Sequence, residues 1–180
     1  MVGLASGLGW LTVAAEVVAI VAMLLVDRYA TPTIDRWRRG TQGEEPVGAI
    51  IDGMRDDGWF AIHDVSVGHG NIDHIVIGPA GIFTIETKSH HGRINSDRIE
   101  SRMLKQAYAE AKLVERITGM KVQPLLVFSR AYLIPAVCRR EGVVILPARM
   151  LPGHLARLPV KLSAEQTAVL HARLAAAVLA

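Results

Sequence analysis

The sequence has little of several residue types that define common protein classes. Its single cysteine, Cys138, excludes an internal disulfide framework and a cysteine-based zinc site, and is typical of a reducing compartment. No internal repeat or low-complexity tract is visible. Because 51% of the residues are hydrophobic, the chain has ample apolar surface to bury, which disfavours disorder. A length of 180 residues suffices for one domain with an appendage, but not for two ordinary domains.

Charged residues are almost absent from the first 26 positions. Between Gly3 and Val26 the only one is Glu16. As a helix this stretch would be about 36 Å long, enough to cross a hydrocarbon core of about 30 Å. The alternative is a cleaved signal peptide, but no basic segment precedes the run, and Asp27 and Arg28 follow it where small residues would mark a cleavage site. We therefore expect residues 1–26 to be an uncleaved transmembrane anchor.

The distribution of basic residues predicts the orientation of this anchor. Every Lys and Arg follows residue 26, and residues 27–42 form a polar, basic juxtamembrane linker. Because basic flanks stay on the cytoplasmic side, we expect a single-pass membrane protein with a cytoplasmic C-terminal domain. Glu16 would cost about 2.5 to 3.5 kcal/mol within the bilayer. Either the apolar span absorbs a protonated carboxyl, or the residue makes a helix–helix contact that assembles a homo-oligomer.

Apolar periodicity predicts one α/β domain over residues 43–180. The first three strand-like runs are separated by short turns rich in glycine and proline, so they should form an antiparallel meander. Two later apolar runs should be buried strands of the same mixed sheet, flanked by helices. The expected elements are a helix from Gly43 to Asp57-Gly58, strands Trp59 to Val67, Ile72 to Ile77 and Gly81 to Thr87, a helix from Arg102 to Thr118, strands Val122 to Phe128 and Gly142 to Leu146, and a helix opened by a capping box at Ser163 and Gln166.

Polar residues on two of these strands form a candidate active site. Every second side chain of a strand lies on one face, so Glu86 and Lys88 share a face. If the Gly78–Gly81 turn closes a hairpin, Asp73 lies roughly opposite Glu86. Such a carboxylate pair suits Mg²⁺ or Mn²⁺, and the lysine could orient or deprotonate an attacking water. Taken alone, Glu86 and Lys88 would more often be an exposed ion pair.

A wider set of residues distinguishes between these interpretations. It comprises Gly43-Glu44 with Val47, Ile72-Asp73-His74, Gly78-Pro79 with Gly81, Glu86 and Lys88 with Gly92, and Gln106. This pattern resembles the nuclease-related domain (NERD) family of the PD-(D/E)xK nuclease superfamily, from about Gly43 to Phe128. The resemblance implies a restriction-endonuclease-like fold, with Asp73 and Glu86 as metal ligands and Lys88 as catalytic base or water positioner. It also implies catalytic contributions from Glu44 and Gln106.

The helix that bears Gln106 also carries a possible nucleic-acid-binding ridge. Four basic residues recur along it, and they could hold a phosphate backbone without reading bases. The alternative is a solvated helix face balanced by Glu110 and Glu115. The ridge residues are Arg102, Lys105, Lys112 and Arg116.

Four histidines lie near the motif in sequence, at His69, His74, His90 and His91. Their spacing is not that of a regular metal site, so zinc binding by them is disfavoured.

Taken together, the candidate active site and the family resemblance lead us to expect a Mg²⁺- or Mn²⁺-dependent nuclease that hydrolyses DNA or RNA from a membrane anchor. The alternatives are a non-catalytic nucleic-acid-binding module and a membrane scaffold.

Overall fold

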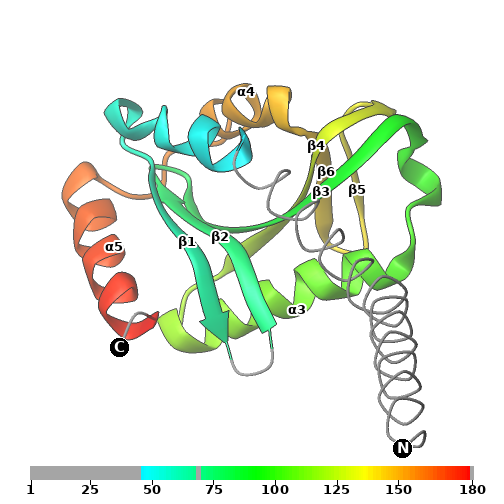
Figure 1. The fold of residues 1–180 in the computed structure, drawn as a ribbon. Helices are drawn as coiled ribbons and strands as arrows, with labels where there is room; N and C mark the ends of the chain where they lie inside the picture. The colour runs from blue at the N-terminus through cyan, green and yellow to red at the C-terminus, as the bar shows by residue number, and fades with distance from the viewer. Residues whose placement is uncertain (1–45, 68–69, 179–180) are drawn as a thin grey trace, which may run out of the picture. The chain divides into compact units, whose positions relative to one another are not determined.

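A six-stranded mixed sheet forms the centre of the structure, in the order β1-β2-β3-β4-β6-β5 (Figure 1). The structure is a computed structural model that describes residues 46–67 and 70–178. The first three strands form the predicted antiparallel meander, β4 lies parallel to β3 and to β6, and β5 is antiparallel to β6. The strands are β1 (Phe60–Val67), β2 (Gly70–Gly78), β3 (Gly81–Asn95), β4 (Val122–Ile134), β5 (Cys138–Arg140) and β6 (Val143–Pro147).

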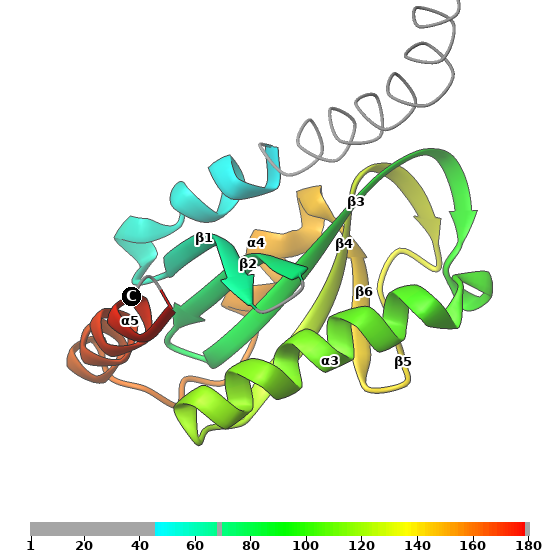
Figure 2. The same cartoon turned by 60° about the horizontal axis from the view of Figure 1, so that its bottom comes forward.

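Helices cover both faces of this sheet (Figure 2). A helix over residues 46–52 and α4 (Leu151–Ala156) lie on one face, and α3 (Ser101–Thr118) and α5 (Ala164–Val178) lie on the other. The described residues also form short 3₁₀ helices: η1 (Arg55–Asp57), η2 (Ser96–Arg98) and η3 (Ala148–Met150). The chain is therefore a mixed α/β fold, as its order of apolar runs predicted.

Strand β2 shows why the sheet is buried on both sides. Its apolar residues form a continuous run, so alternate side chains enter different cores. Val76 packs with the helix over residues 46–52 and α4, whereas Ile75 and Ile77 pack with α3 and α5. A third cluster joins α3 to β4 and β6. This arrangement fixes the faces of the strands and thereby aims Asp73 and Glu86 toward α3.

The structure confirms the predicted end of α3 and the predicted start of α5. Gly119 caps α3 in the left-handed conformation with φ of 67°, and its N–H donates to the Glu115 carbonyl at 2.8 Å. At the start of α5, the Gln166 N–H donates to Ser163 Oγ at 3.1 Å, and the Ser163 N–H donates to Gln166 Oε1 at 2.8 Å. These reciprocal bonds form the predicted capping box.

Several predicted boundaries were wrong. Strand β3 continues beyond Thr87, and β4 continues beyond Phe128, because the two strands pair with each other in a polar extension that apolar periodicity does not mark. Strand β5 and helix α4 were not predicted, since elements of three and six residues contain too little pattern.

Some predictions concern residues outside the described part of the chain. They are the transmembrane anchor over residues 1–26, the linker over residues 27–42, Glu44 and His69. Among the helices of residues 46–67 and 70–178, none combines the length and the apolar character needed to cross a membrane.

Candidate active site

The hairpin of β2 and β3 brings the predicted carboxylates together. Its register pairs His74 with Ile85, so the next position along places Asp73 opposite Glu86. The Thr87 backbone N–H donates to Asp73 Oδ2 at 2.7 Å, which fixes the Asp73 carboxylate against β3. The hairpin geometry expected from the sequence is therefore present.

Lys88 joins this pair to helix α3. Its Nζ donates to Glu86 Oε1, forming an ion pair, and to Gln106 Oε1 at 3.5 Å. The Glu86 side chain is 4% exposed and that of Lys88 is 23% exposed. The simple interpretation of an exposed surface pair is therefore wrong, because the carboxylate lies inside the protein. Gln106 is brought to the site by α3, as the resemblance implied.

Glu110 is a member of the site that the sequence interpretation missed. It was expected only as a balancing charge on a solvated helix face, but it is 9% exposed and accepts a hydrogen bond from Gln106 Nε2 at 3.0 Å. A signal was available, because Glu110 is in helical phase with the buried Ala107 and Val114. An acidic residue within an apolar stripe is costly to bury and indicates a site.

The electrostatics of the site reflect an excess of carboxyl groups. Burial, followed by the charge of the nearby Glu86, raises the pKa of Glu110 to about 9, although the Gln106 hydrogen bond acts in the opposite direction. Near neutral pH Glu110 is therefore protonated. The carboxyl groups of Glu86 and Glu110 each keep one buried oxygen, Oε2, without a hydrogen-bond partner among the described residues. The Glu86 oxygen is an acceptor that a cation, a water or a donor group would satisfy, whereas the corresponding oxygen of the protonated Glu110 can carry the proton and donate it.

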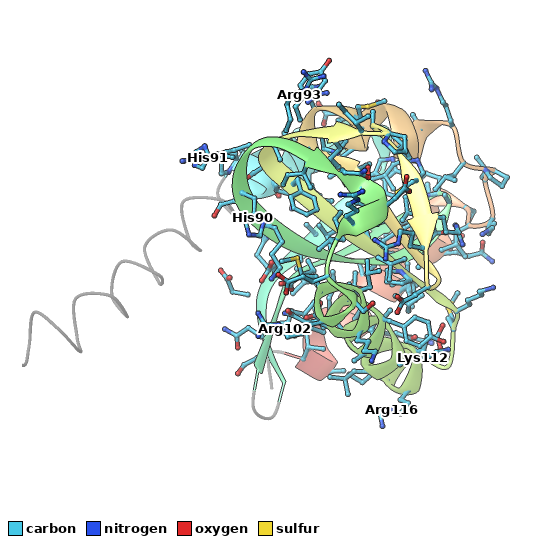
Figure 3. All side chains as sticks on the ribbon, turned by 90° about the vertical axis from the view of Figure 1, so that its right-hand side faces the viewer. His90, His91, Arg93, Arg102, Lys112 and Arg116 are labelled. Carbon is cyan, nitrogen blue, oxygen red and sulfur yellow. The ribbon has the colours of Figure 1, made fainter. Side chains whose placement is uncertain are left out.

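The candidate site has few protein ligands for a metal. Within residues 46–67 and 70–178, no three side chains of His, Cys, Asp or Glu are grouped so as to hold an ion. The histidines do not converge either: His74 is buried beside His63, whereas His90 and His91 lie exposed on β3 (Figure 3). A metal bound here would therefore take two carboxylates and complete its shell with water or substrate oxygens, as Mg²⁺ commonly does.

The predicted basic ridge is exposed along α3. Figure 3 shows Arg102 nearer to β3, with Lys112 and Arg116 toward the far end of the helix. Lys112 is paired with Glu115, so part of its charge is already neutralised. All four ridge residues, Arg102, Lys105, Lys112 and Arg116, are exposed.

A second polar cluster lies on the opposite face of β2. His63 Nδ1 and His74 Nδ1 are 2.8 Å apart, and His63 Nε2 lies 3.2 Å from Asp52 Oδ1. Burial, and then the neighbouring His63, lower the pKa of His74 to about 4, while Asp52 acts in the opposite direction. His74 is thus neutral in the folded protein at neutral pH.

We expect this neutral His74 to make the protein acid-sensitive. An unfolded His74 binds a proton near pH 6.5 and the folded one only near pH 4, so the free energy of unfolding should fall as the pH drops through that window. The loss should be about 2 to 3 kcal/mol by this linkage. Urea unfolding of wild type, His74→Gln and the control His171→Gln at pH 7.5 and pH 4.5 measures it. Equal pH dependence in wild type and His74→Gln would refute the assignment.

Comparison with known proteins identifies the family of the chain. Residues 39–129 match the sequence profile described as the nuclease-related domain, and the chain belongs to this NERD family. An uncharacterized protein of Bacillus anthracis is 29% identical over 84 residues, which cover 44% of this chain. The chain spans 39% of that relative's length. The crystal structure of a repair endonuclease from Pyrococcus abyssi aligns with a TM-score of 0.35 and 18% identity, over 64% of this chain and 44% of that chain.

Proposed function

We propose that this chain is a metal-dependent nuclease that hydrolyses phosphodiester bonds of DNA or RNA. The proposal rests chiefly on one observation, the contact of the Lys88 ammonium group with a buried carboxylate that faces Asp73 across the hairpin. Membership of the nuclease-related domain family supports it. A restriction-endonuclease-like arrangement of the catalytic strands is part of the same proposal.

The donor set suits Mg²⁺ or Mn²⁺. Asp73 and Glu86 offer hard oxygen ligands, and the buried Glu86 Oε2 has no hydrogen-bond partner among the described residues. When bound, such an ion would activate water and neutralise charge on the phosphate. Asp73 and Glu86 would hold it, while Lys88 balances the charge that remains on Glu86.

The other residues would position the reacting groups. Lys88 Nζ donates in two directions, to Glu86 and to Gln106, and its third hydrogen is available to orient a water or a phosphate oxygen. Gln106 links that ammonium group to Glu110 and so limits its rotation. Glu44, predicted as a further catalytic residue, lies outside the described residues.

A cleavage assay on the purified full chain tests the proposal. The protein is incubated with single- and double-stranded DNA and RNA in Mg²⁺, in Mn²⁺ and in EDTA. We expect cleavage that requires a divalent ion and is far slower in Lys88→Ala. If wild-type protein cleaves none of these substrates more than Lys88→Ala does, the chain is instead a non-catalytic nucleic-acid-binding module.

We expect Asp73 to control metal affinity. Mg²⁺ or Mn²⁺ at about 100 times its dissociation constant should stabilise the wild type by about 2.7 kcal/mol through binding the native state. Asp73→Asn should abolish most of this gain, while the amide oxygen can still accept from the Thr87 N–H. Calorimetric titration and thermal unfolding measure both effects. Asp56→Asn, an exposed residue of η1, is the control, and equal affinity in wild type and Asp73→Asn would exclude Asp73 as a ligand.

We also propose that residues 1–26 anchor the nuclease in a membrane, with the catalytic domain in the cytoplasm. The support is the apolar run itself and the basic residues that follow it. Full-length protein should sediment with membranes and resist extraction by carbonate. A reporter fused to the C-terminus should be active in the cytoplasm. Recovery of the full chain in the soluble fraction would remove the anchor, and an extracytoplasmic signal would reverse the orientation.

A further inference from the structure

The β3–β4 pair continues beyond the candidate active site and forms a basic groove. We call this the distal groove: a cavity of about 610 Å³ over the ends of β3 and β4 and the start of η3. None of its lining residues is acidic, and three are arginines, Arg93, Arg130 and Arg149. Figure 3 shows Arg93 on β3, away from Lys112 and Arg116 of the predicted ridge. The distal groove is thus a second basic surface that the sequence interpretation did not predict.

The strand register assembles the groove from residues far apart in the sequence. Arg93 lies opposite Tyr132, and Arg130 lies opposite His91, with 3.4 Å between Arg130 Nη1 and His91 Nε2. Along β4 the exposed Arg130 and Tyr132 alternate with Ala131 and Leu133, which are buried in the core. This alternation holds the basic and aromatic side chains toward solvent.

Tyr132 is the aromatic centre of the groove. Tyr132 is 58% exposed. The Arg149 guanidinium lies over the ring at 4.7 Å from its centroid, which orients the ring. The remaining exposed surface of the ring is a platform on which another planar group can stack.

The distal groove begins where the catalytic strand segment ends. Lys88 lies opposite Phe128, which lines the groove, and the register of the two strands shifts immediately afterward, before His91. Ser129, another lining residue, donates from its Oγ to the Lys88 carbonyl at 3.5 Å. Ala131 and Leu133 pack with residues of α3, and Lys88 also contacts α3 through Gln106, so the exposed Arg130 and Tyr132 point away from the face that carries the Lys88 site.

We propose that the distal groove binds single-stranded nucleic acid, with a base stacked on Tyr132 and phosphates held by Arg93, Arg130 and Arg149. Cationic side chains beside an exposed aromatic ring are the means by which proteins bind single strands without reading sequence. A duplex keeps its bases stacked on one another and offers none to the ring. Binding of a single strand to the groove does not depend on the proposed nuclease activity.

The competing surface on α3 has a similar pair and so supplies a matched control. Tyr108 is 44% exposed, and Lys112 Nζ lies 5.5 Å from the centre of its ring. That lysine, however, is paired with Glu115, so part of its own charge is neutralised. Replacing either tyrosine removes an exposed ring beside a cation, but only Tyr132 lies in the distal groove.

The test measures binding and cleavage separately on the full chain. Fluorescence anisotropy in EDTA, with a labelled 12-nucleotide oligothymidylate and a 12-base-pair blunt duplex, measures binding without cleavage. We expect Tyr132→Ala to weaken binding of the single strand by roughly 5- to 100-fold, the range for loss of one base–aromatic stack. Tyr132→Phe and Tyr108→Ala should bind as wild type does. Arg130→Ala should reduce the salt dependence of binding.

Three results would overturn the groove proposal. They are unchanged single-strand binding in Tyr132→Ala, a larger loss in Tyr108→Ala, and a Tyr132-dependent affinity for anionic phosphatidylserine vesicles that exceeds the affinity for the oligonucleotide. Cleavage assays in Mg²⁺ separate this proposal from the nuclease proposal. If wild type cleaves nothing but loses single-strand binding on Tyr132→Ala, the groove proposal stands and the nuclease proposal fails. If Tyr132→Ala binds and cleaves single strands normally, the groove proposal fails and the nuclease proposal stands.

Discussion

Replacing Lys88 with alanine should lower the rate of phosphodiester cleavage by about a thousandfold. A side chain that acts on the reacting water typically contributes 10²- to 10⁴-fold, and Lys88 also compensates the charge of Glu86. Because Glu86 is buried, its loss of a cationic partner should lower the free energy of unfolding as well, by about 1 to 3 kcal/mol. The sequence alone suggested that Lys88 lies on a solvated face, where its removal would have disturbed folding little.

Two further variants separate catalysis from stability. Lys88→Arg keeps a positive charge beside Glu86 and should recover most of the stability, but its bulkier and less acidic group should restore little of the turnover. Lys161→Ala removes an exposed lysine outside the site and serves as the control. Cleavage rates and urea unfolding are measured on all three. We expect added metal not to restore the turnover of Lys88→Ala. Wild-type turnover in Lys88→Ala would show that Lys88 has no part in the mechanism.

Replacing Gly78 with alanine should destabilise the domain by about 3 kcal/mol, the upper part of the usual range for overpacking. A Cβ at Gly78 would lie 2.1 to 2.6 Å from three atoms of the Trp59 ring, far inside van der Waals contact. Trp59 cannot move away easily, because it is 4% exposed and packs against Phe83 with ring centres 5.8 Å apart. The glycine is therefore required by the close approach of the indole, not by its own backbone angles.

A double-mutant cycle with Trp59→Ala tests this cause. In that background Gly78→Ala should cost less than about 0.5 kcal/mol, since the clashing ring is gone. Gly70→Ala, in the same strand, has no atom within 4 Å of its added Cβ and should change stability by less than about 0.5 kcal/mol. Urea unfolding measures each variant. An equal cost of Gly78→Ala with and without Trp59 would show that the clash is not the cause.

The hairpin half of the site could be predicted because its geometry is local. A two-residue turn after Gly78 fixes the register, so simple counting along the two strands brings Asp73 opposite Glu86. The side-chain alternation of β3 then adds Lys88 to the same face. These three residues span a short stretch of sequence, and no distant contact is needed to align them.

The rest of the site depends on distant contacts that the sequence pattern does not specify. The depth to which α3 packs on the sheet decides how far Glu110 is buried, and although its helical phase matches that of the apolar residues, its charge favoured exposure. The length of β3 was underestimated for the same reason. Beyond Lys88 its pairing with β4 buries Ala131 and Leu133 but leaves polar side chains on the exposed side, so the apolar run ends before the strand does.

The outer strands of the sheet, β1 and β5, limit unwanted association between copies of the protein. A long unpaired strand edge is a template for another chain, and high local concentration at a surface would increase that risk. Strand β5 has only three residues, of which Arg139 and Arg140 are charged. In β1, Asp64 has φ of 51° and is not paired with β2, although His63 and Val65 on either side of it are. One edge is therefore short and cationic and the other is interrupted, so neither offers a continuous ladder for aggregation.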